Sequence, residues 1–111
     1  MPNSQTLLAR LRGLASLSIA DPAFDPAALA AGARLSERTL YRRLKELTGL
    51  TPAAWLREQR LEYARRLLES GARPTVAQVA YAAGFVNADY FGQLYFQRFG
   101  CRPSDHLRGE C

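Results

Sequence analysis

Apolar residues recur every three to four positions along almost the whole chain, and no segment shows the two-residue alternation of a half-buried strand. This spacing places the apolar side chains on one face of a helix, so the sequence predicts an all-α protein of about seven helices. The first is an amphipathic helix that ends before Asp21-Pro22. Its expected buried face consists of Leu7, Leu8, Leu11, Leu14, Ala15 and Leu17.

Capping residues, prolines and glycines mark where the later helices begin and end. An N-cap side chain accepts a hydrogen bond from the first helical turn, and glycine favours the left-handed conformation that ends many helices. The expected starts are Asp25, Ser36, Thr51, Thr75, Asn87 and Arg102, and the expected ends are Gly32, Gly49, Gly71, Gly84 and Gly100. These signals divide the chain into a lead-in helix (1–24), a helix-turn-helix (25–50), a linker helix (51–71), and a second helix-turn-helix with a C-terminal helix (72–111).

The helix signals of the first half return in the second half, which identifies an internal repeat. Upstream, Leu29-Ala30 corresponds to Val79-Ala80 at a shift of 50 positions. Downstream, a shift of 51 positions places Ser36 on Asn87, Leu40 on Phe91, Leu44 on Tyr95, Gly49 on Gly100 and Pro52 on Pro103. Each copy has a short helix, a tight turn and a capped helix, which is the order of a helix-turn-helix.

The charge of the chain is unevenly distributed. Fifteen basic and ten acidic residues give a formal net charge of +5. Between Arg34 and Arg66 there are nine basic and four acidic residues, whereas the remainder has six of each. Fourteen of the fifteen basic residues are arginine, which binds phosphate and guanine through two parallel hydrogen bonds. This distribution indicates a polyanionic partner.

Length and composition exclude several other classes of protein. The chain has 111 residues, of which 48% are hydrophobic and 23% charged, as in one soluble domain. It lacks the roughly 20 consecutive apolar residues of a membrane span, so no membrane partner is expected. Because Cys101 and Cys111 lack metal-ligand spacing and His106 is the single histidine, no metal or other cofactor is expected. We expect a reducing cytoplasm, an exposed free thiol at Cys111 and a small buried apolar side chain at Cys101.

The helix that begins at Ser36 combines a leucine face with a basic face. With Leu40 at the centre of the buried face, Arg38, Arg42 and Lys45 lie nearest the opposite direction and Tyr41 lies on the flank. A charged face is most often simply solvated, but this one belongs to the second helix of a helix-turn-helix, which enters the major groove of DNA. Arg38 and Arg42 suit guanine, whereas Lys45 and Arg43 suit phosphates.

The second unit is expected to bind DNA more weakly. The repeat replaces the three basic residues with Asp89, Gln93 and Phe96, and phosphates would repel the aspartate. Gln93 suits adenine, and Asp89 suits the amino group of cytosine. The linker helix would span about 28 Å, against about 34 Å between successive major-groove segments on one side of DNA. Its alternating arginines and glutamates are expected to form mainly surface pairs: Arg57, Arg60, Arg65 and Arg66 with Glu58, Glu62 and Glu69.

Two helix-turn-helix units joined by one long helix resemble the AraC-type transcription regulators. The motifs that carry the resemblance run from Ser36 to Thr51-Pro52 in the first unit and from Gly84-Phe85 to Pro103 in the second. The resemblance implies sequence-specific binding to bacterial promoter DNA, and RNA polymerase as a further partner of activators. By position, it implies contacts to DNA bases from Arg38, Tyr41, Arg42, Asp89 and Gln93. We also expect contacts to the DNA sugar-phosphate backbone from Arg43, Lys45, Thr51, Arg98 and Arg102.

The resemblance also shows where this chain departs from the family. The family commonly has basic residues at the positions of Gln93 and Phe96, and often glycine at the position of Arg34, where arginine is tolerable if its backbone stays right-handed. Relatives usually attach an effector-binding, dimerisation or receiver domain to this module. We therefore expect either a small free-standing regulator or the output domain of a larger protein, monomeric as a module and dimeric through such a domain.

Two other functions are considered. Catalysis is not expected, because His106 beside Asp105 lacks a third orienting group and lies on a structural helix. A protein-interaction module with weak or no DNA binding is the alternative, because Tyr90 and Phe96 are candidates for exposed aromatic residues.

Overall fold

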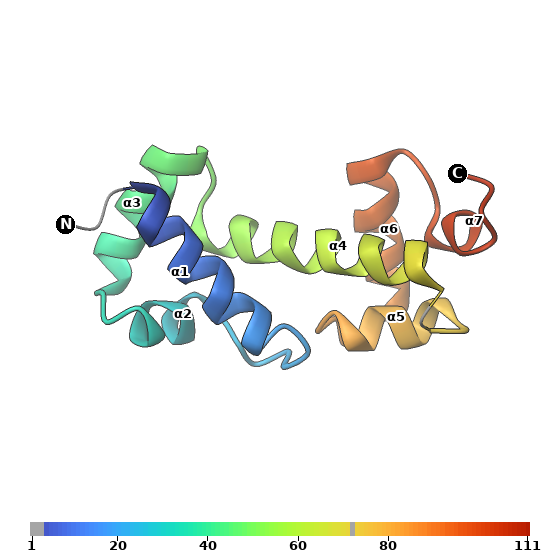
Figure 1. The fold of residues 1–111 in the computed structure, drawn as a ribbon, viewed down its shortest axis with the longest axis horizontal. Helices are drawn as coiled ribbons and strands as arrows, with labels where there is room; N and C mark the ends of the chain where they lie inside the picture. Colours follow the sequence, from blue (N-terminus) through green and yellow to red (C-terminus); the bar gives the residue numbers. More distant parts are fainter. Residues whose placement is uncertain (1–3, 72) are drawn as a thin grey trace. The chain divides into compact units, whose positions relative to one another are not determined.

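The computed structural model describes residues 4–71 and 73–111, and in these ranges it contains α helices and no strand (Figure 1). This confirms the all-α prediction. None of the described helices is long and apolar enough to cross a bilayer. The seven helices are α1 (Ser4–Leu17), α2 (Pro26–Gly32), α3 (Glu37–Thr48), α4 (Pro52–Ser70), α5 (Val76–Ala82), α6 (Ala88–Phe99) and α7 (Pro103–Leu107).

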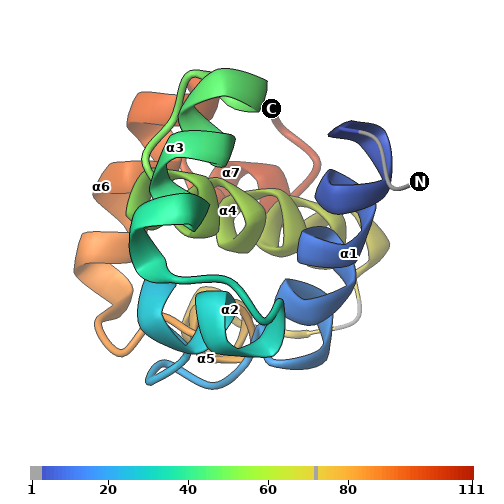
Figure 2. The ribbon, with the colours of Figure 1, turned by 90° about the vertical axis from the view of Figure 1, so that its left-hand side faces the viewer.

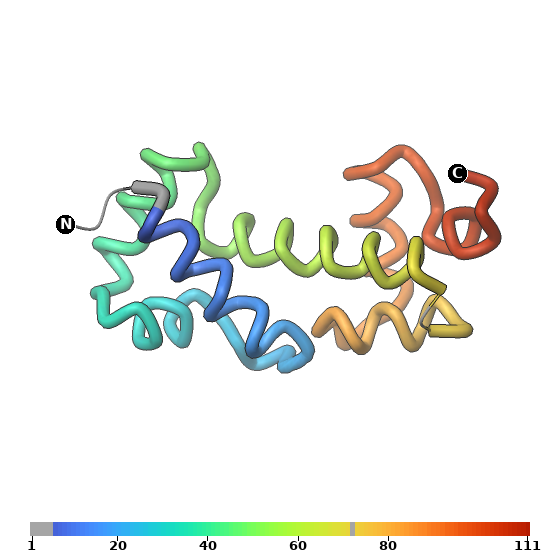
Figure 3. Tube along the Cα trace, in the orientation of Figure 1, coloured from blue at the N-terminus to red at the C-terminus, as the bar shows by residue number. Residues whose placement is uncertain are grey.

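The chain forms two compact units, residues 1–59 and 60–111, each with its own apolar core. The first unit contains α1, α2, α3 and the beginning of α4, and its helices can be followed in Figure 2. The second contains the rest of α4 with α5, α6 and α7, and the path of its chain is traced in Figure 3. The boundary falls within α4, so this helix supplies residues to both cores.

The core of the first unit is built around leucines from its three helices. Leu11, Leu29, Leu40 and Leu44 are fully buried, and α4 adds Trp55 and Leu56. The prediction for Leu17 is wrong, because its side chain is 87% exposed. At 100° per residue, Leu17 lies about 120° away from the direction of Leu11, so it points off the buried face of α1.

Aromatic rings fill the core of the second unit. Phe91 and Tyr95 on α6 are fully buried, with ring centroids 5.6 Å apart. Phe85 lies 5.0 Å from Phe91, and Phe99 lies 4.7 Å from Tyr95. Tilted rings at such separations stabilise a core beyond the area that they bury. The second unit therefore uses aromatic residues where the repeat has leucine in the first.

The N-caps predicted from the sequence form side-chain hydrogen bonds, with one exception. Ser36 Oγ accepts from the Thr39 N–H at 3.0 Å, and Asn87 Oδ1 accepts from the Tyr90 N–H at 3.0 Å. Asp25, Thr51 and Thr75 cap α2, α4 and α5 in the same way. Arg102 makes no such bond, so α7 depends on Pro103 at its first position.

The turn between the two helices of each helix-turn-helix has the same hydrogen bonds in both units. In the first unit, the Leu35 N–H donates to the Ala30 carbonyl oxygen at 2.9 Å, and the Arg34 N–H donates to the Ala31 carbonyl oxygen at 3.1 Å. This pair of bonds is a Schellman motif, which requires a left-handed residue at the position of Arg34. The right-handed backbone on which tolerance of arginine was expected to depend is not observed, because Arg34 has φ of 59°. In the second unit, Gly84 occupies this position with φ of 87°.

An arginine anchors the turn in each unit. The Arg10 guanidinium donates to the Ala33 carbonyl at 2.9 Å, and the Arg60 guanidinium donates to the Ala83 carbonyl at 3.4 Å. A shift of 50 positions relates the two pairs, so the repeat extends to α1 and α4. The expectation of a surface pair is wrong for Arg60, which is only 8% exposed. Arg65 does form the expected surface ion pairs, because its guanidinium nitrogens lie 3.4 Å from the Glu62 carboxylate and 3.6 Å from the Glu69 carboxylate.

Candidate nucleic-acid interface

The second helix of the first unit, α3, presents a basic face to solvent. Its opposite face is fixed in the core by Leu40 and Leu44, both fully buried. Arg38, Tyr41 and Arg42 are exposed as the helical spacing predicts, and half of the Tyr41 side chain is accessible. Burial of the leucines therefore determines the direction in which the basic side chains point.

Arg38 and Arg42 differ from the other basic residues of α3 in their contacts. Arg43 is half-buried and lies 4.0 Å from Glu46, and Lys45 Nζ donates to the Gly49 carbonyl at 3.3 Å. Within the part of the chain that the structure describes, the side chains of Arg38 and Arg42 form no hydrogen bond or ion pair. Their guanidinium groups are available to an external acceptor without loss of an internal contact.

Thr51, at the start of α4, is one of the residues expected to contact the DNA backbone, and it lies close to the exposed face of α3. Its hydroxyl oxygen caps α4 by accepting from the Ala54 N–H at 3.2 Å. Thr51, Tyr41, Glu37 and Pro26 border one hollow of about 210 Å³. The structure thus brings Thr51 beside the exposed side of α3.

The corresponding helix of the second unit, α6, has a less basic surface. Asp89, Gln93 and Phe96 are exposed, and they line an open hollow of about 690 Å³ together with Arg102 and Ser104. Asp89, Gln93, Phe96 and Arg102, which the sequence analysis identified, therefore lie around one depression. Arg102 is the only basic residue that lines it.

Arg98 points away from that depression. Its guanidinium lies 3.5 Å from Glu62 on α4 and 4.8 Å from the centre of the Phe99 ring. At 100° per residue, Arg98 is about 140° around α6 from Gln93, so the two side chains leave different faces. The structure does not bring Arg98 together with the other candidate contacts of α6.

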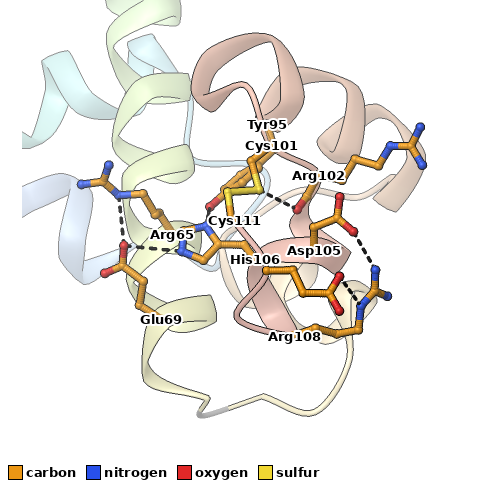
Figure 4. The surroundings of a disulfide bond; sticks show 10 residues. Arg65, Glu69, Tyr95, Cys101, Arg102, Asp105, His106, Arg108 and Cys111 are labelled. Carbon is orange, nitrogen blue, oxygen red and sulfur yellow. Dashed lines mark hydrogen bonds and ion pairs between the residues drawn. A yellow bond between two sulfur atoms is a disulfide. The ribbon is translucent and has the colours of Figure 1, made fainter.

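Both cysteines lie at the end of the second unit and differ from expectation (Figure 4). Cys101 and Cys111 form a disulfide, so the expected free thiol at Cys111 is wrong. Cys101 is half-buried rather than fully buried. They are ten positions apart in the sequence, but the turn after α6 and the short α7 fold the chain back so that the Cα atoms lie 6.0 Å apart. The sequence contains no signal for this return beyond the caps of α7.

His106 on α7 packs beside this disulfide and has a structural partner. Its Nδ1 lies 2.6 Å from the Tyr95 hydroxyl oxygen, and its Nε2 lies 3.6 Å from Glu69 Oε1. Burial raises the pKa of Tyr95 to about 12, with Arg65 acting in the opposite direction and Glu69 and Glu62 adding to the rise. Tyr95 therefore keeps its proton near neutral pH and remains a hydrogen-bond partner of the imidazole.

The repeated units and the exposed second helix of each define a helix-turn-helix module. A family model described as a helix-turn-helix domain matches residues 29–109. A crystal structure of an AraC-type regulator from Chromobacterium violaceum is 27% identical, covers 97% of this chain and 95% of its own, and superposes with a TM-score of 0.86. The chain belongs to the AraC-type family of DNA-binding domains of transcription regulators, and not to an enzyme family.

Two further comparisons concern proteins with a described function. The transcriptional activators RhaS of Shigella boydii and Escherichia coli are 41% identical over 75 residues, which is 68% of this chain and 27% of theirs. The chain thus corresponds to about a quarter of the length of these curated relatives. The DNA-binding domain of AdpA, crystallised with a target DNA, is 31% identical with a TM-score of 0.76, and covers 90% of this chain and 91% of its own.

Proposed function

We propose that this chain binds promoter DNA sequence-specifically, with α3 in the major groove and Arg38, Tyr41 and Arg42 at the base edges. The observation that carries the proposal is the pair of exposed guanidinium groups on α3, which are free of internal partners in the described part of the chain. Two parallel N–H donors match O6 and N7 of guanine, and such a contact discriminates against a wrong base by about 1–3 kcal/mol.

Phosphate contacts position the module on the duplex. Arg43 and Lys45 flank the reading face of α3, and Thr51 lies at its edge. Arg102 lies beside α6. Arg98 already pairs with Glu62, so a phosphate would have to compete with the Glu62 carboxylate for the Arg98 guanidinium. We therefore rank Arg98 as the weakest of these backbone contacts.

The second unit contributes base contacts from Asp89 and Gln93 with little net charge. The continuous helix α4 has 19 residues, or about 28 Å at 1.5 Å per residue, against about 34 Å between successive major-groove segments. We propose that both units contact adjacent segments of one duplex. A single chain would then make a two-part contact without a dimer.

The cellular role follows from the relatives and is proposed with the same DNA contact. RhaS is a transcriptional activator, so we propose activation, with RNA polymerase as a further partner in the cytoplasm. We propose that the module binds as a monomer, and that any dimer forms through a domain outside this chain. A protein partner would find exposed aromatic side chains at Tyr81, Tyr90 and Phe96.

Selection of bound sequences from random duplex DNA, with wild type beside Arg42→Ala, tests the proposal. Wild type should enrich one sequence class that contains guanine. Arg42→Ala should weaken the selected site by about 1–3 kcal/mol and leave random DNA nearly unaffected. Arg12→Ala, which removes the same charge from an exposed site on α1, is the matched control and should weaken both equally and slightly.

Two results would count against this assignment. Equal losses of affinity for selected and random DNA in Arg42→Ala would show that Arg42 contacts a phosphate and not a base. If wild type enriched no sequence and bound duplex DNA no better than Arg42→Ala, the protein-interaction alternative would replace DNA recognition.

A further inference from the structure

Three side chains with affinity for soft metal ions meet at the end of the second unit (Figure 4). Cys101 follows α6, His106 lies on α7 and Cys111 follows α7, with four residues between successive members. The sulfur atoms and one imidazole nitrogen all lie within 4.8 Å of one another. These residues do not belong to the exposed basic face of α3 or to the hollow beside α6.

We propose that the dithiol form of this cluster binds one Zn²⁺ ion through both sulfurs and one ring nitrogen of His106. Zinc takes Cys and His ligands in tetrahedral geometry, so three protein ligands leave a fourth position for water. Each thiol releases its proton to solvent as its thiolate binds the ion. The proposal is independent of DNA recognition, because it uses none of the residues assigned to the duplex.

The distances in the cluster are close to those that zinc requires. With Zn–S near 2.3 Å and Zn–N near 2.0 Å, ligand atoms at a tetrahedral ion lie roughly 3.5–3.8 Å apart. The observed limit of 4.8 Å exceeds this by about 1 Å, so the imidazole nitrogen must come closer, and the two sulfurs, bonded in the disulfide, must move apart after reduction. Cys111 is exposed and lies beyond the last helix, so its side chain can make this adjustment without disturbing the core.

The imidazole is held in the way that a metal ligand requires. A ligating histidine uses one nitrogen for the metal and the other for a hydrogen bond that fixes the ring. His106 has a polar neighbour at both nitrogens, the Tyr95 hydroxyl at 2.6 Å from Nδ1 and the Glu69 carboxylate at 3.6 Å from Nε2. If Nε2 binds the ion, Nδ1 keeps its hydrogen bond with the Tyr95 hydroxyl, which orients the ring. The Glu69 carboxylate also adds negative charge beside a cation.

The disulfide and the zinc complex are alternative states of the same two sulfurs, because zinc needs both thiolates. A trialkylphosphine converts one state into the other. Phosphorus attacks one sulfur and displaces the second as a thiolate, and water then supplies oxygen to form the phosphine oxide and the protons that complete two thiols. The oxidised chain provides only the imidazole and should bind zinc weakly.

The experiment compares the phosphine-reduced and oxidised forms of the 111-residue chain. Co²⁺ serves first as a spectroscopic probe, since two thiolate ligands give a near-ultraviolet charge-transfer band and tetrahedral geometry gives strong visible bands. Zn²⁺ affinity is then measured by competition with a chromophoric chelator. Because His106 is the single histidine, its ring proton signals in NMR spectra report its coordination without any substitution.

We expect the reduced chain to bind one equivalent with tetrahedral spectra and a shifted His106 signal. Cys111→Ser, at an exposed position, should weaken binding by at least about tenfold, the lower limit found when even an indirect partner of a ligand is removed. Asp105→Asn, a neighbouring residue outside the cluster, is the control and should bind as wild type. The proposal is overturned if reduced wild type binds no more tightly than Cys101→Ser/Cys111→Ser, or if the His106 signal does not move.

Discussion

Arg34 is the residue at which the two units differ most in backbone cost. Left-handed geometry costs a side chain with Cβ roughly 1–2 kcal/mol, and the second unit avoids this with Gly84. Glycine also loses more backbone freedom on folding, by about 0.5–1 kcal/mol, so only part of the strain can be recovered. The position therefore offers a direct measurement of strain in the turn of the first unit.

We predict that Arg34→Gly stabilises the chain by about 0.5–1 kcal/mol, the difference between the relief of strain and the added entropy of the unfolded chain. Urea unfolding followed by circular dichroism measures this change. Arg34→Ala removes the same side chain but keeps Cβ, so it should give no such gain. Equal stabilisation by both variants would show that the guanidinium, and not the backbone conformation, is unfavourable.

At the scale of the element, α6 has Asp89, Gln93 and Phe96 at the repeat positions of Arg38, Arg42 and Lys45, the basic residues of the proposed DNA-binding face of α3. Asp89→Asn removes a repulsion, and Gln93→Arg adds a donor at the border of the same hollow. We predict that each change tightens binding to random duplex DNA by about 1 kcal/mol, the usual size of a charge-assisted contact. Fluorescence anisotropy with a random-sequence duplex measures the gain.

The matched control for these changes is Ser16→Arg, which adds the same positive charge to an exposed residue on α1, outside α6. It should tighten binding less than Gln93→Arg. Footprinting then distinguishes two roles for the native residues. If wild type protects two adjacent major-groove segments equally and the Asp89→Asn/Gln93→Arg variant binds no better, Asp89 and Gln93 read bases directly in their native form.

The elements themselves could largely be predicted from local signals. Ser36 and Asn87 cap their helices as expected, because an N-cap bond depends on residues only three positions apart. Leu17, Arg60 and Cys111 could not be placed in this way. Their environments depend on the rotation of α1, on the Ala83 carbonyl and on the return of the chain after α7, which are tertiary features. The exposed face of α3 could be predicted because Leu40 and Leu44 fix its rotation.

For the whole molecule, we predict that the affinity for duplex DNA falls steeply with salt. The excess positive charge lies between Arg34 and Arg66, so neutralisation of about five phosphates is expected and the slope of log K against log salt should be near −4 to −5. Titrations from low to moderate salt measure this slope. A nearly flat affinity would favour a protein partner over DNA.

The position of the unit boundary within α4 has a consequence for how the molecule opens. Residues 52–59 pack in one core and residues 60–70 in the other, and each segment alone is shorter than the roughly 12–15 residues that a helix needs to persist in water. Each half should therefore lose its helical hydrogen bonds when its own core opens. Native-state hydrogen exchange should show two opening free energies along α4, changing near Gln59 and Arg60. A mutation that loosens one core would then speed exchange in one half of a single continuous helix.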